Sequence, residues 1–381
     1  MIYLKRTLVF GIALLLILLV FVSGFNGQTI NKNNICRLIQ LNEKSYEIVE
    51  IKNSLVSCGD DLFYYEERYA VIIVGYYGDE QHYKWFTNDA QRQYNVLTEK
   101  YGFNDSEIYV LVTLKEEWVD NLSMDPAIID YNATEDNIII IFDYLKNIVT
   151  KNDLLYVVVI NHGNDDHHIN FWKLKIFIDF VQGIFAHDTY FVLEKIKKVN
   201  NKELNNEGNL AFYHKNNKID NKIYDYELND YTKDITARRF IFVLQPCFAG
   251  GFINDLSNKN HVVITASKEV QLAFAPFIGE FYYGLEGYAN DSNNDGRLSL
   301  GEVYEYTANR IFEIIKNNPE ENMGQPQHPL IDDNGDKIGH HYSNLGYDTN
   351  NKYKDGYVAA RIYNLSYEDA NLNNLNFEKL N

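Results

Sequence analysis

The sequence predicts an α/β fold with a mostly parallel central sheet flanked by helices, and two apolar runs predict it most directly. The first run, residues 154–160, leads into His162-Gly163, and the second, residues 240–244, leads into Cys247. Short runs of β-branched and aromatic residues that end at turn residues are typical of buried strands in a parallel sheet. Functional groups gather at the carboxyl ends of such strands, so we expect His162 and Cys247 at one edge of the sheet.

Strands and helices are expected to alternate along the chain. The expected strands cover residues 69–75, 108–112, 154–160, 240–244 and 261–267. The expected helices cover residues 85–101, where Gly102 acts as a stop, and 137–149, where Thr134 acts as the N-cap. This alternation is typical of an α/β fold whose parallel strands are joined by right-handed crossovers.

Composition and charge limit the classes of protein to consider. The 381 residues are 46% hydrophobic, which is enough for one large domain with a full core and for appendages. The formal net charge is −18, and no basic patch stands out in the sequence. Binding to nucleic acid requires clustered Lys and Arg, so we expect no nucleic-acid partner. The excess of acid favours a soluble exported protein or one that binds cations.

The N-terminus has the layout of a secretory signal. Two basic residues precede an apolar run at residues 8–22, and small residues lead to a possible cut after Gly24. The run is nearly as long as the about 20 residues that cross a bilayer, so residues 7–24 could instead remain as a membrane tether. We therefore expect export, with residues 1–24 as a signal peptide or as an anchor, and a protein that is secreted or held on the outer side of the membrane.

The rest of the chain divides into an extension, a main domain and a tail. Residues 25–67 form an N-terminal extension without strong periodicity, and residues 68–345 form the main domain. The Asn-rich residues 346–381 are expected to pack loosely or to lie outside the core. Residues 165–207 are interpreted as an insertion near the edge of the sheet that carries His162. The insertion could cover a cleft or be cut during activation, and a plain surface elaboration fits it equally well.

The chain has three cysteines, which are Cys36, Cys58 and Cys247. In an oxidising compartment Cys36 and Cys58 could pair, which would leave Cys247 as a free thiol. An alternative is that all three are small buried residues with no shared role. An odd thiol in an exported protein is a candidate nucleophile.

A thiol and an imidazole at neighbouring strand ends can act as a nucleophile and its base. His162 would accept the proton of Cys247 and later protonate a leaving amine. The backbone N–H groups of Gly163 and Cys247 could face a developing oxyanion, and Gly250-Gly251 is expected to let the chain turn sharply after the nucleophile. From spacing alone, a core cysteine beside a capping histidine is the commoner explanation.

Several further motifs occur in a fixed order along the chain. They are Asn88-Asp89-Ala90, Tyr101-Gly102-Phe103, Ala133–Asn137, His162-Gly163, Cys247–Leu256 and Ile264–Ser267. This ordered set, over about residues 68 to 340, resembles the legumain-like cysteine peptidases of the caspase/legumain clan, especially their prokaryotic branch. The resemblance implies a caspase-like α/β/α sandwich and a cysteine-type endopeptidase. It also implies a Cys/His dyad without a third member and hydrolysis of peptide bonds through a thioester acyl-enzyme.

The resemblance also implies a pocket for the residue before the cleaved bond. It assigns Gln245 and Asp89 as substrate-binding residues. The chain departs from the family at five places. Asn161 stands where Asp is usual, Gln245 stands where Glu is usual, and Trp85 falls near the place of a legumain arginine. Pro246 and Ala249 are variant as well. An amide both donates and accepts hydrogen bonds, so the choice between Asn, Asp or another residue stays open.

Residues 291–302 fit the twelve-residue calcium loop of EF-hands. Such a loop supplies oxygen ligands at alternate positions, a glycine for a sharp turn and a closing bidentate Glu. The expected ligands are Asp291, Asn293, Asp295, Arg297 through its carbonyl, Ser299 directly or through water, and Glu302. We expect structural Ca²⁺ here and no cofactor for catalysis, with an acidic helix cap as the alternative. Residues 332–336 resemble half of such a loop, and a turn stabilised by Asx side chains is the preferred interpretation.

Three functions fit these sequence features. The first is an exported, calcium-stabilised cysteine endopeptidase that acts on a protein or peptide. The second is an inactive relative that serves as a caspase-like calcium-binding interaction module, which the altered neighbours of His162 and Cys247 keep open. The third is a peptide ligase or transamidase, in which an amine instead of water resolves the acyl-enzyme, as legumain relatives can do.

Overall fold

The computed structural model divides the chain into two units, and the described residues all belong to the second, Tyr64–Asn381. These residues are 65–75, 79–114, 116–165, 189–192, 222–274, 276–319, 325–363 and 365. The expected leader at residues 1–24, nearly all of the extension, the pair Cys36–Cys58 and most of the expected insertion lie outside the described residues. Within the described part, no helix is long and apolar enough to cross a membrane.

A seven-stranded sheet forms the centre of this unit. Its strands are β1 (Arg68–Val74), β2 (Ile108–Val112), β3 (Tyr131–Asn132), β4 (Leu154–Ile160), β8 (Arg239–Leu244), β9 (His261–Thr265) and β10 (Leu330–Asp332). Their order across the sheet is β10-β9-β8-β4-β1-β2-β3, and every pair is parallel except β10 with β9. The mostly parallel α/β fold predicted from the sequence is therefore confirmed, and β2 and β4 have the predicted bounds.

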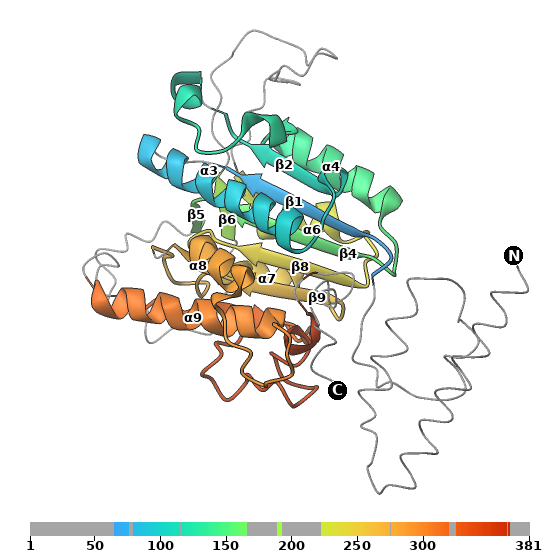
Figure 1. Ribbon diagram of the computed structural model, residues 1–381, viewed down its shortest axis with the longest axis vertical. Helices are drawn as coiled ribbons and strands as arrows, with labels where there is room; N and C mark the ends of the chain where they lie inside the picture. Colours follow the sequence, from blue (N-terminus) through green and yellow to red (C-terminus); the bar gives the residue numbers. More distant parts are fainter. Residues whose placement is uncertain are drawn as a thin grey trace, which may run out of the picture. The chain divides into compact units, whose positions relative to one another are not determined.

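Helices cover both faces of the sheet (Figure 1). One layer contains α3 (Glu80–Asn95), α8 (Phe277–Tyr283) and α9 (Leu300–Asn317), and the other contains α4 (Glu135–Ile148), α6 (Asp225–Thr232) and α7 (Phe252–Leu256). Short helical turns join these elements: η1 (Val96–Lys100), η2 (Asp105–Glu107), η3 (Glu116–Asn121), η4 (Pro126–Ile128), η5 (Ala249–Gly251), η6 (Gly284–Tyr288) and η7 (Ala359–Arg361).

The helices begin earlier than predicted because capping residues precede the apolar pattern. Asp79 caps α3, and its Oδ1 accepts a hydrogen bond from the His82 N–H at 2.8 Å. The helix therefore starts five residues before Trp85, continues as the π-helical turn η1, and ends before Gly102, whose φ is +66°. Thr134 caps α4 as predicted, with its hydroxyl accepting from the Asn137 N–H at 3.3 Å.

The middle strands of the sheet are buried on both faces. All seven residues of β4 are buried, and α4, α6 and α7 pack on one side of it around a continuous apolar cluster. Burial of each large apolar side chain contributes about 1.5–3 kcal/mol. The sequence therefore reads as unbroken apolar runs here, because no face of these strands meets water.

A second, antiparallel sheet begins at the carboxyl end of β4. It consists of β5 (Gly163–Asp165), β6 (Thr189–Val192) and β7 (Lys222–Tyr224), in the order β5-β6-β7. β5 starts directly after His162, and β6 lies inside the stretch interpreted as an insertion. The described part of that stretch therefore adds a strand beside the edge that carries His162.

The described part of the expected C-terminal tail packs into the unit instead of lying outside its core. The buried Asp333 carboxylate accepts hydrogen bonds from the N–H groups of Gly356 at 3.0 Å and Ala359 at 2.6 Å. Asp355 accepts from the Asp333 N–H at 3.0 Å and lies 2.6 Å from Nδ1 of His340. The packed structure therefore continues past residue 345, because buried carboxylates after β10 bind the later backbone.

Arg68, at the start of β1, ties two other parts of the backbone to this strand. Its side chain is 1% exposed and donates to the carbonyls of Tyr101 at 2.7 Å, Gly102 at 2.9 Å and Leu365 at 2.7 Å. The Phe103 ring lies 4.3 Å from the guanidinium carbon. One buried cation thus holds the end of α3–η1 and the C-terminal segment against the first strand.

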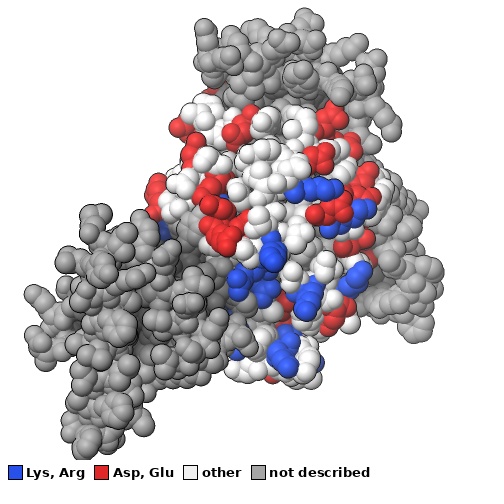
Figure 2. Space-filling model, turned by 90° about the vertical axis from the view of Figure 1, so that its right-hand side faces the viewer, with Lys and Arg blue, Asp and Glu red and all other residues white. Residues whose placement is uncertain are grey.

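Charges on the described surface are mixed. Figure 2 shows one face on which Lys and Arg side chains lie among Asp and Glu side chains. Exposed ion pairs of the described unit include Lys146–Asp234 at 2.5 Å and Lys233–Asp230 at 2.7 Å. Pairs of this kind stabilise a fold little, so the buried contacts of the core and of Arg68 carry the stability.

Replacing Arg68 by Met should destabilise the unit by about 3 kcal/mol or more, because buried carbonyls that lose their donor cost about 1–3 kcal/mol each. Urea unfolding followed by circular dichroism would measure the change. Lys233→Met is the matched control, since it removes an exposed Lys and should leave the midpoint close to that of the wild type. An unchanged midpoint for Arg68→Met would contradict the role given to this side chain.

Candidate functional site

His162 and Cys247 follow two strands that are direct neighbours in the sheet. β4 and β8 are paired in parallel, with Val159 opposite Leu244. The chain leaves both strands at the same edge within one residue of this pair. The register therefore places His162 and Cys247 at one edge of the sheet, as the sequence predicts.

The main chain after His162 lies directly against the cysteine segment. A Cβ atom added to Gly163 would lie 2.6 Å from Cβ of Pro246 and 3.1 Å from the backbone N of Cys247, and it would also collide with the Cys247 carbonyl oxygen. Contacts below 3.0 Å do not occur for real side chains, so position 163 has room only for glycine. This close approach places the backbone of Gly163 directly beside the backbone of Cys247.

Two rings from α3 pack on the ring of His162. The centroid of the His82 ring lies 4.9 Å from that of His162, and the centroid of the Phe86 ring lies 5.2 Å away. His82 is itself held by Asp79, whose Oδ1 is 2.9 Å from its Nδ1. These contacts fix the direction of the His162 imidazole. His82 and Phe86 were not predicted from the sequence, although their spacing of four residues places them on one face of a helix.

The sulfur of Cys247 is surrounded by backbone N–H groups. The Ala273 N–H donates to Sγ at 3.2 Å, and the backbone N–H groups of Gly163 and Cys247 itself also favour the thiolate. Burial is the larger influence and raises the pKa of the Cys247 thiol above its ordinary value. In this state the thiol is therefore protonated near neutral pH, and a base must remove its proton before it can attack a carbonyl.

The turn after Cys247 is made differently from the prediction. Phe248 takes the left-handed conformation, with φ of 63° and ψ of 14°, whereas the sharp turn was predicted at Gly250-Gly251. The Phe248 N–H donates to the Gln271 carbonyl at 2.8 Å, which holds this uncommon conformation in place. Gly250 has another role, since a Cβ atom there would lie 2.7 Å from the carbonyl carbon of Lys268.

Gln245 and Asp89, the two residues assigned to substrate binding, are both largely buried. Gln245, which directly follows β8, is 9% exposed, and its Oε1 has no hydrogen-bond partner among the described residues. Asp89 lies on α3, where its Oδ1 is 3.6 Å from Arg92 and close to Gly279 of α8. Burial raises the pKa of Asp89 to about 6, while the charge of Arg92 opposes this shift. Gln245 is thus beside the nucleophile, whereas Asp89 lies between α3 and α8.

The predicted calcium loop forms a compact turn before α9. Asp291 accepts from the N–H groups of Asp295 at 3.1 Å and Gly296 at 2.8 Å, and Gly296 has a φ of +81°. Glu302 closes the loop from the helix, because its Oε1 accepts from the Ser292 N–H at 2.8 Å and its Oε2 from the Ser299 N–H at 2.8 Å. The side-chain oxygens thus bind loop backbone.

The acidic side chains of this loop are not gathered around a common point. Within the described part of the chain, no three His, Cys, Asp or Glu side chains lie together as a group that could hold a metal ion. Asp291, Asp295 and Glu302 therefore remain candidates that would have to turn toward an ion. Burial and the charges of the other two raise the pKa of Asp295, as expected for acids that share a small loop.

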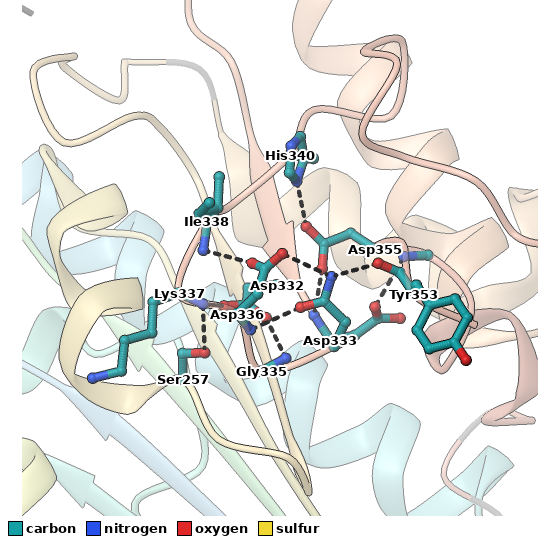
Figure 3. A network of polar contacts seen from close by, with 12 residues as sticks. Ser257, Asp332, Asp333, Gly335, Asp336, Lys337, Ile338, His340, Tyr353 and Asp355 are labelled. Atoms are coloured by element: carbon teal, nitrogen blue, oxygen red, sulfur yellow. Dashed lines mark hydrogen bonds and ion pairs between the residues drawn. The ribbon is translucent and has the colours of Figure 1, made fainter. Parts of the chain in front are cut away.

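The second acidic segment, residues 332–336, forms the turn stabilised by Asx side chains that the sequence indicates. Asp332 accepts from the N–H groups of Gly335 at 2.9 Å and Lys337 at 2.9 Å. Asp336 accepts from the Ile338 N–H at 2.9 Å (Figure 3). The segment thus satisfies its own backbone, and its neighbour Asp333 anchors the C-terminal segment.

No protein-family model and no curated protein matches this chain. Among the solved structures that are similar to it is protein GSU0716 from Geobacter sulfurreducens, with 11% identity, 70% of this chain and 92% of that chain covered, and a TM-score of 0.38. Another is caspase-1 from Spodoptera frugiperda, with 10% identity, 71% and 89% coverage, and a TM-score of 0.38. Similarity at this level carries no conclusion about the chemistry of Cys247, and the resemblance to legumain-like peptidases stays a prediction from the sequence.

Gly163→Ala should remove the reactivity of the site while the core stays folded. The added methyl group must push the segment after His162 away from Pro246 and Cys247, and a displacement of about 1 Å in a catalytic site costs about a hundredfold in rate. The measurement is the rate at which the variant cleaves a peptide, compared with the wild-type rate, and a thermal melt verifies that the variant is folded. A folded Gly163→Ala protein that keeps the wild-type rate would show that this contact is unimportant.

Proposed function

We propose that this chain is an exported cysteine-type endopeptidase of the legumain-like kind, with Cys247 as the nucleophile and His162 as its base. The observation that carries the proposal is the close packing of Gly163 on the Pro246 side chain and the Cys247 backbone. A core cysteine beside a capping histidine does not require this contact. A Cys/His dyad with two N–H groups aimed at one oxyanion does require it.

The proposed reaction begins with transfer of the Cys247 proton to His162. The thiolate then attacks the carbonyl carbon of the peptide bond, and the N–H groups of Gly163 and Cys247 stabilise the oxyanion of the tetrahedral intermediate. His162 gives its proton to the departing amine, which leaves a thioester on Cys247. Water then attacks the thioester with His162 as the base, and this step releases the acid and restores the thiol.

The surroundings of Cys247 are consistent with a site in which His162 removes the thiol proton only when a substrate is bound. Burial raises the pKa of the thiol, so the resting site holds a neutral thiol instead of an exposed, easily oxidised thiolate. Gln245, whose Oε1 has no partner in the described part of the chain, is proposed to contact the residue before the cleaved bond, and Asp89 is proposed as a second substrate-binding residue. The proposed partners are a protein or peptide substrate and, through residues 7–24, a membrane.

One observation favours the inactive alternative. The thiol is partly buried and its pKa is raised, which also describes a structural cysteine in a binding module that has lost its activity. A peptide carrying an acyloxymethyl ketone distinguishes the two, because only a functioning dyad turns the thiol into a nucleophile toward it. Adding an amine to the assay separates hydrolysis from transpeptidation, since a ligase would join the amine to the acyl group.

Cys247→Ala should abolish hydrolysis of a peptide library by the purified protein, and His162→Ala should reduce it by about 10²–10⁴-fold, the usual contribution of a general base. Mass spectrometry of the library identifies both the products and the residue before the cut. Wild-type turnover by Cys247→Ala would refute the dyad.

We also propose that residues 291–302 bind structural Ca²⁺. The glycine turn at Gly296 and the Glu302 side chain that closes the loop are already in place, and oxygen ligands of this kind suit a hard cation. Asp291, Asn293 and Asp295 supply the remaining side-chain oxygens, with the Arg297 carbonyl and Ser299. The loop lies before α9 and outside the Cys/His motifs, so the ion would act on stability alone.

Chelation should therefore lower the melting temperature of calcium-loaded protein, and Glu302→Gln should blunt this response. An ion that binds only the folded form raises the free energy of unfolding by about 2.7 kcal/mol when its concentration is a hundredfold above its Kd. Calorimetry with and without chelator measures the effect. The amide that replaces the carboxylate still accepts a hydrogen bond at the helix cap, so this variant separates loss of the ion from loss of the cap. A melting temperature of calcium-loaded protein that does not change on addition of chelator would refute the proposal that this loop binds structural calcium.

A further inference from the structure

The loop after β9, residues 268–274, packs against the turn that carries Cys247. It makes three hydrogen bonds with the turn. The Ala273 N–H donates to Sγ of Cys247 at 3.2 Å, the Cys247 thiol donates to the Ala273 carbonyl at 3.8 Å, and the Gln271 carbonyl accepts from the Phe248 N–H at 2.8 Å. Gly250 packs so closely on Lys268 that no side chain fits between them. The position of this loop therefore determines where the N–H donor to the sulfur lies, and it also stabilises the left-handed conformation of Phe248 after the cysteine.

A single buried amide ties the two ends of the loop together. Gln327, which is 3% exposed, accepts from the Phe274 N–H through Oε1 at 3.0 Å and donates from Nε2 to the Ala266 carbonyl at 3.0 Å. Phe274 follows Ala273 directly, so the bond to Gln327 fixes the residue next to the sulfur donor. Gln327 comes from the segment before β10, 80 residues away from Cys247 in the sequence.

The middle of the loop has a second attachment to the same segment. The Oε1 of Gln271 accepts from the His328 N–H at 3.1 Å, and its Nε2 lies 3.0 Å from Nδ1 of His328. Burial lowers the pKa of His328, with a smaller effect from the charge of Lys268, so its ring is neutral near neutral pH. Gln327 and His328 thus hold the loop at its two ends and at its middle.

We propose that Gln327 and Gln271 are positioning residues for the nucleophile, which act by keeping the Ala273 N–H on the sulfur of Cys247. A donor to a thiolate stabilises the charged form of the thiol, and it keeps this effect only while its direction is fixed. Both glutamines act on the thiol through the backbone of the loop that they hold. The proposal rests on the proposed function for its meaning in catalysis, whereas its effect on the thiol can be measured without a substrate.

The test is the pH dependence of iodoacetamide alkylation at Cys247, followed by mass spectrometry of the peptide that contains it. Gln327→Leu and Gln271→Met should each move the midpoint upward by about one pH unit, which lowers the rate about tenfold at any pH below both midpoints. Ala273→Pro removes the N–H itself and should move the midpoint in the same direction. Peptide turnover, measured in parallel, should fall through kcat with a smaller change in KM.

Gln91→Leu is the matched control. Its Oε1 also accepts a backbone N–H, that of Asp125 at 2.6 Å, but at a turn that lies before η4 instead of beside the cysteine segment. This variant should leave the alkylation profile unchanged. If Gln327→Leu does not fold, Gln271→Met and Ala273→Pro decide the question.

Two outcomes would overturn the proposal. An alkylation midpoint that stays at the wild-type value in folded Gln271→Met and Ala273→Pro shows that the loop does not act on the thiol. Faster alkylation at lower pH shows that the loop only covers the sulfur and that its loosening admits water. A wild-type protein that never cleaves a peptide but shows the upward shift in its variants would refute the proposed function and leave the positioning role in place.

Discussion

The close approach of Gly163 to Cys247 is the constraint on which the rest of the site depends. Because β4 and β8 are paired in parallel, the chain leaves both strands at one edge, and a Cβ atom at position 163 would lie 3.1 Å from the Cys247 backbone N. The buried middle of the sheet fixes the two strands, so the spacing of the site is set by the core. The rings of His82 and Phe86 then fix the direction of His162.

Burial and hydrogen bonding act in opposite directions on the sulfur. Burial raises the pKa of Cys247, while backbone N–H groups from three segments favour the thiolate. Backbone donors have no side-chain freedom to lose, so their effect depends on how firmly each segment is held. This explains why so many contacts around the site join backbone to backbone or bind backbone through an amide such as Gln327.

The fold and the placement of His162 and Cys247 at one edge of the sheet could be predicted because both depend on local pattern. Unbroken apolar runs identify strands such as β4 that are buried on both faces, and the residues after them fall at the sheet edge. Other features depend on contacts between distant segments. Three such contacts are the hydrogen bonds of Arg68 with Leu365, Asp333 with Ala359 and Gln327 with Phe274. Contacts of this kind produce no periodic pattern in the nearby sequence, so the C-terminal boundary and the loop attachments were missed. The start of α3 was missed because a cap has only one residue as its signal.

A crystal structure of the protein treated with a peptide aldehyde tests the central claim most directly. The account predicts a covalent bond from Sγ of Cys247 to the former carbonyl carbon, with the oxygen about 2.7–3.1 Å from the N–H groups of Gly163 and Cys247. The His162 ring should face the new bond, with the rings of α3 still packed behind it. An unmodified Cys247, or an adduct whose oxygen points away from Gly163, would contradict the account.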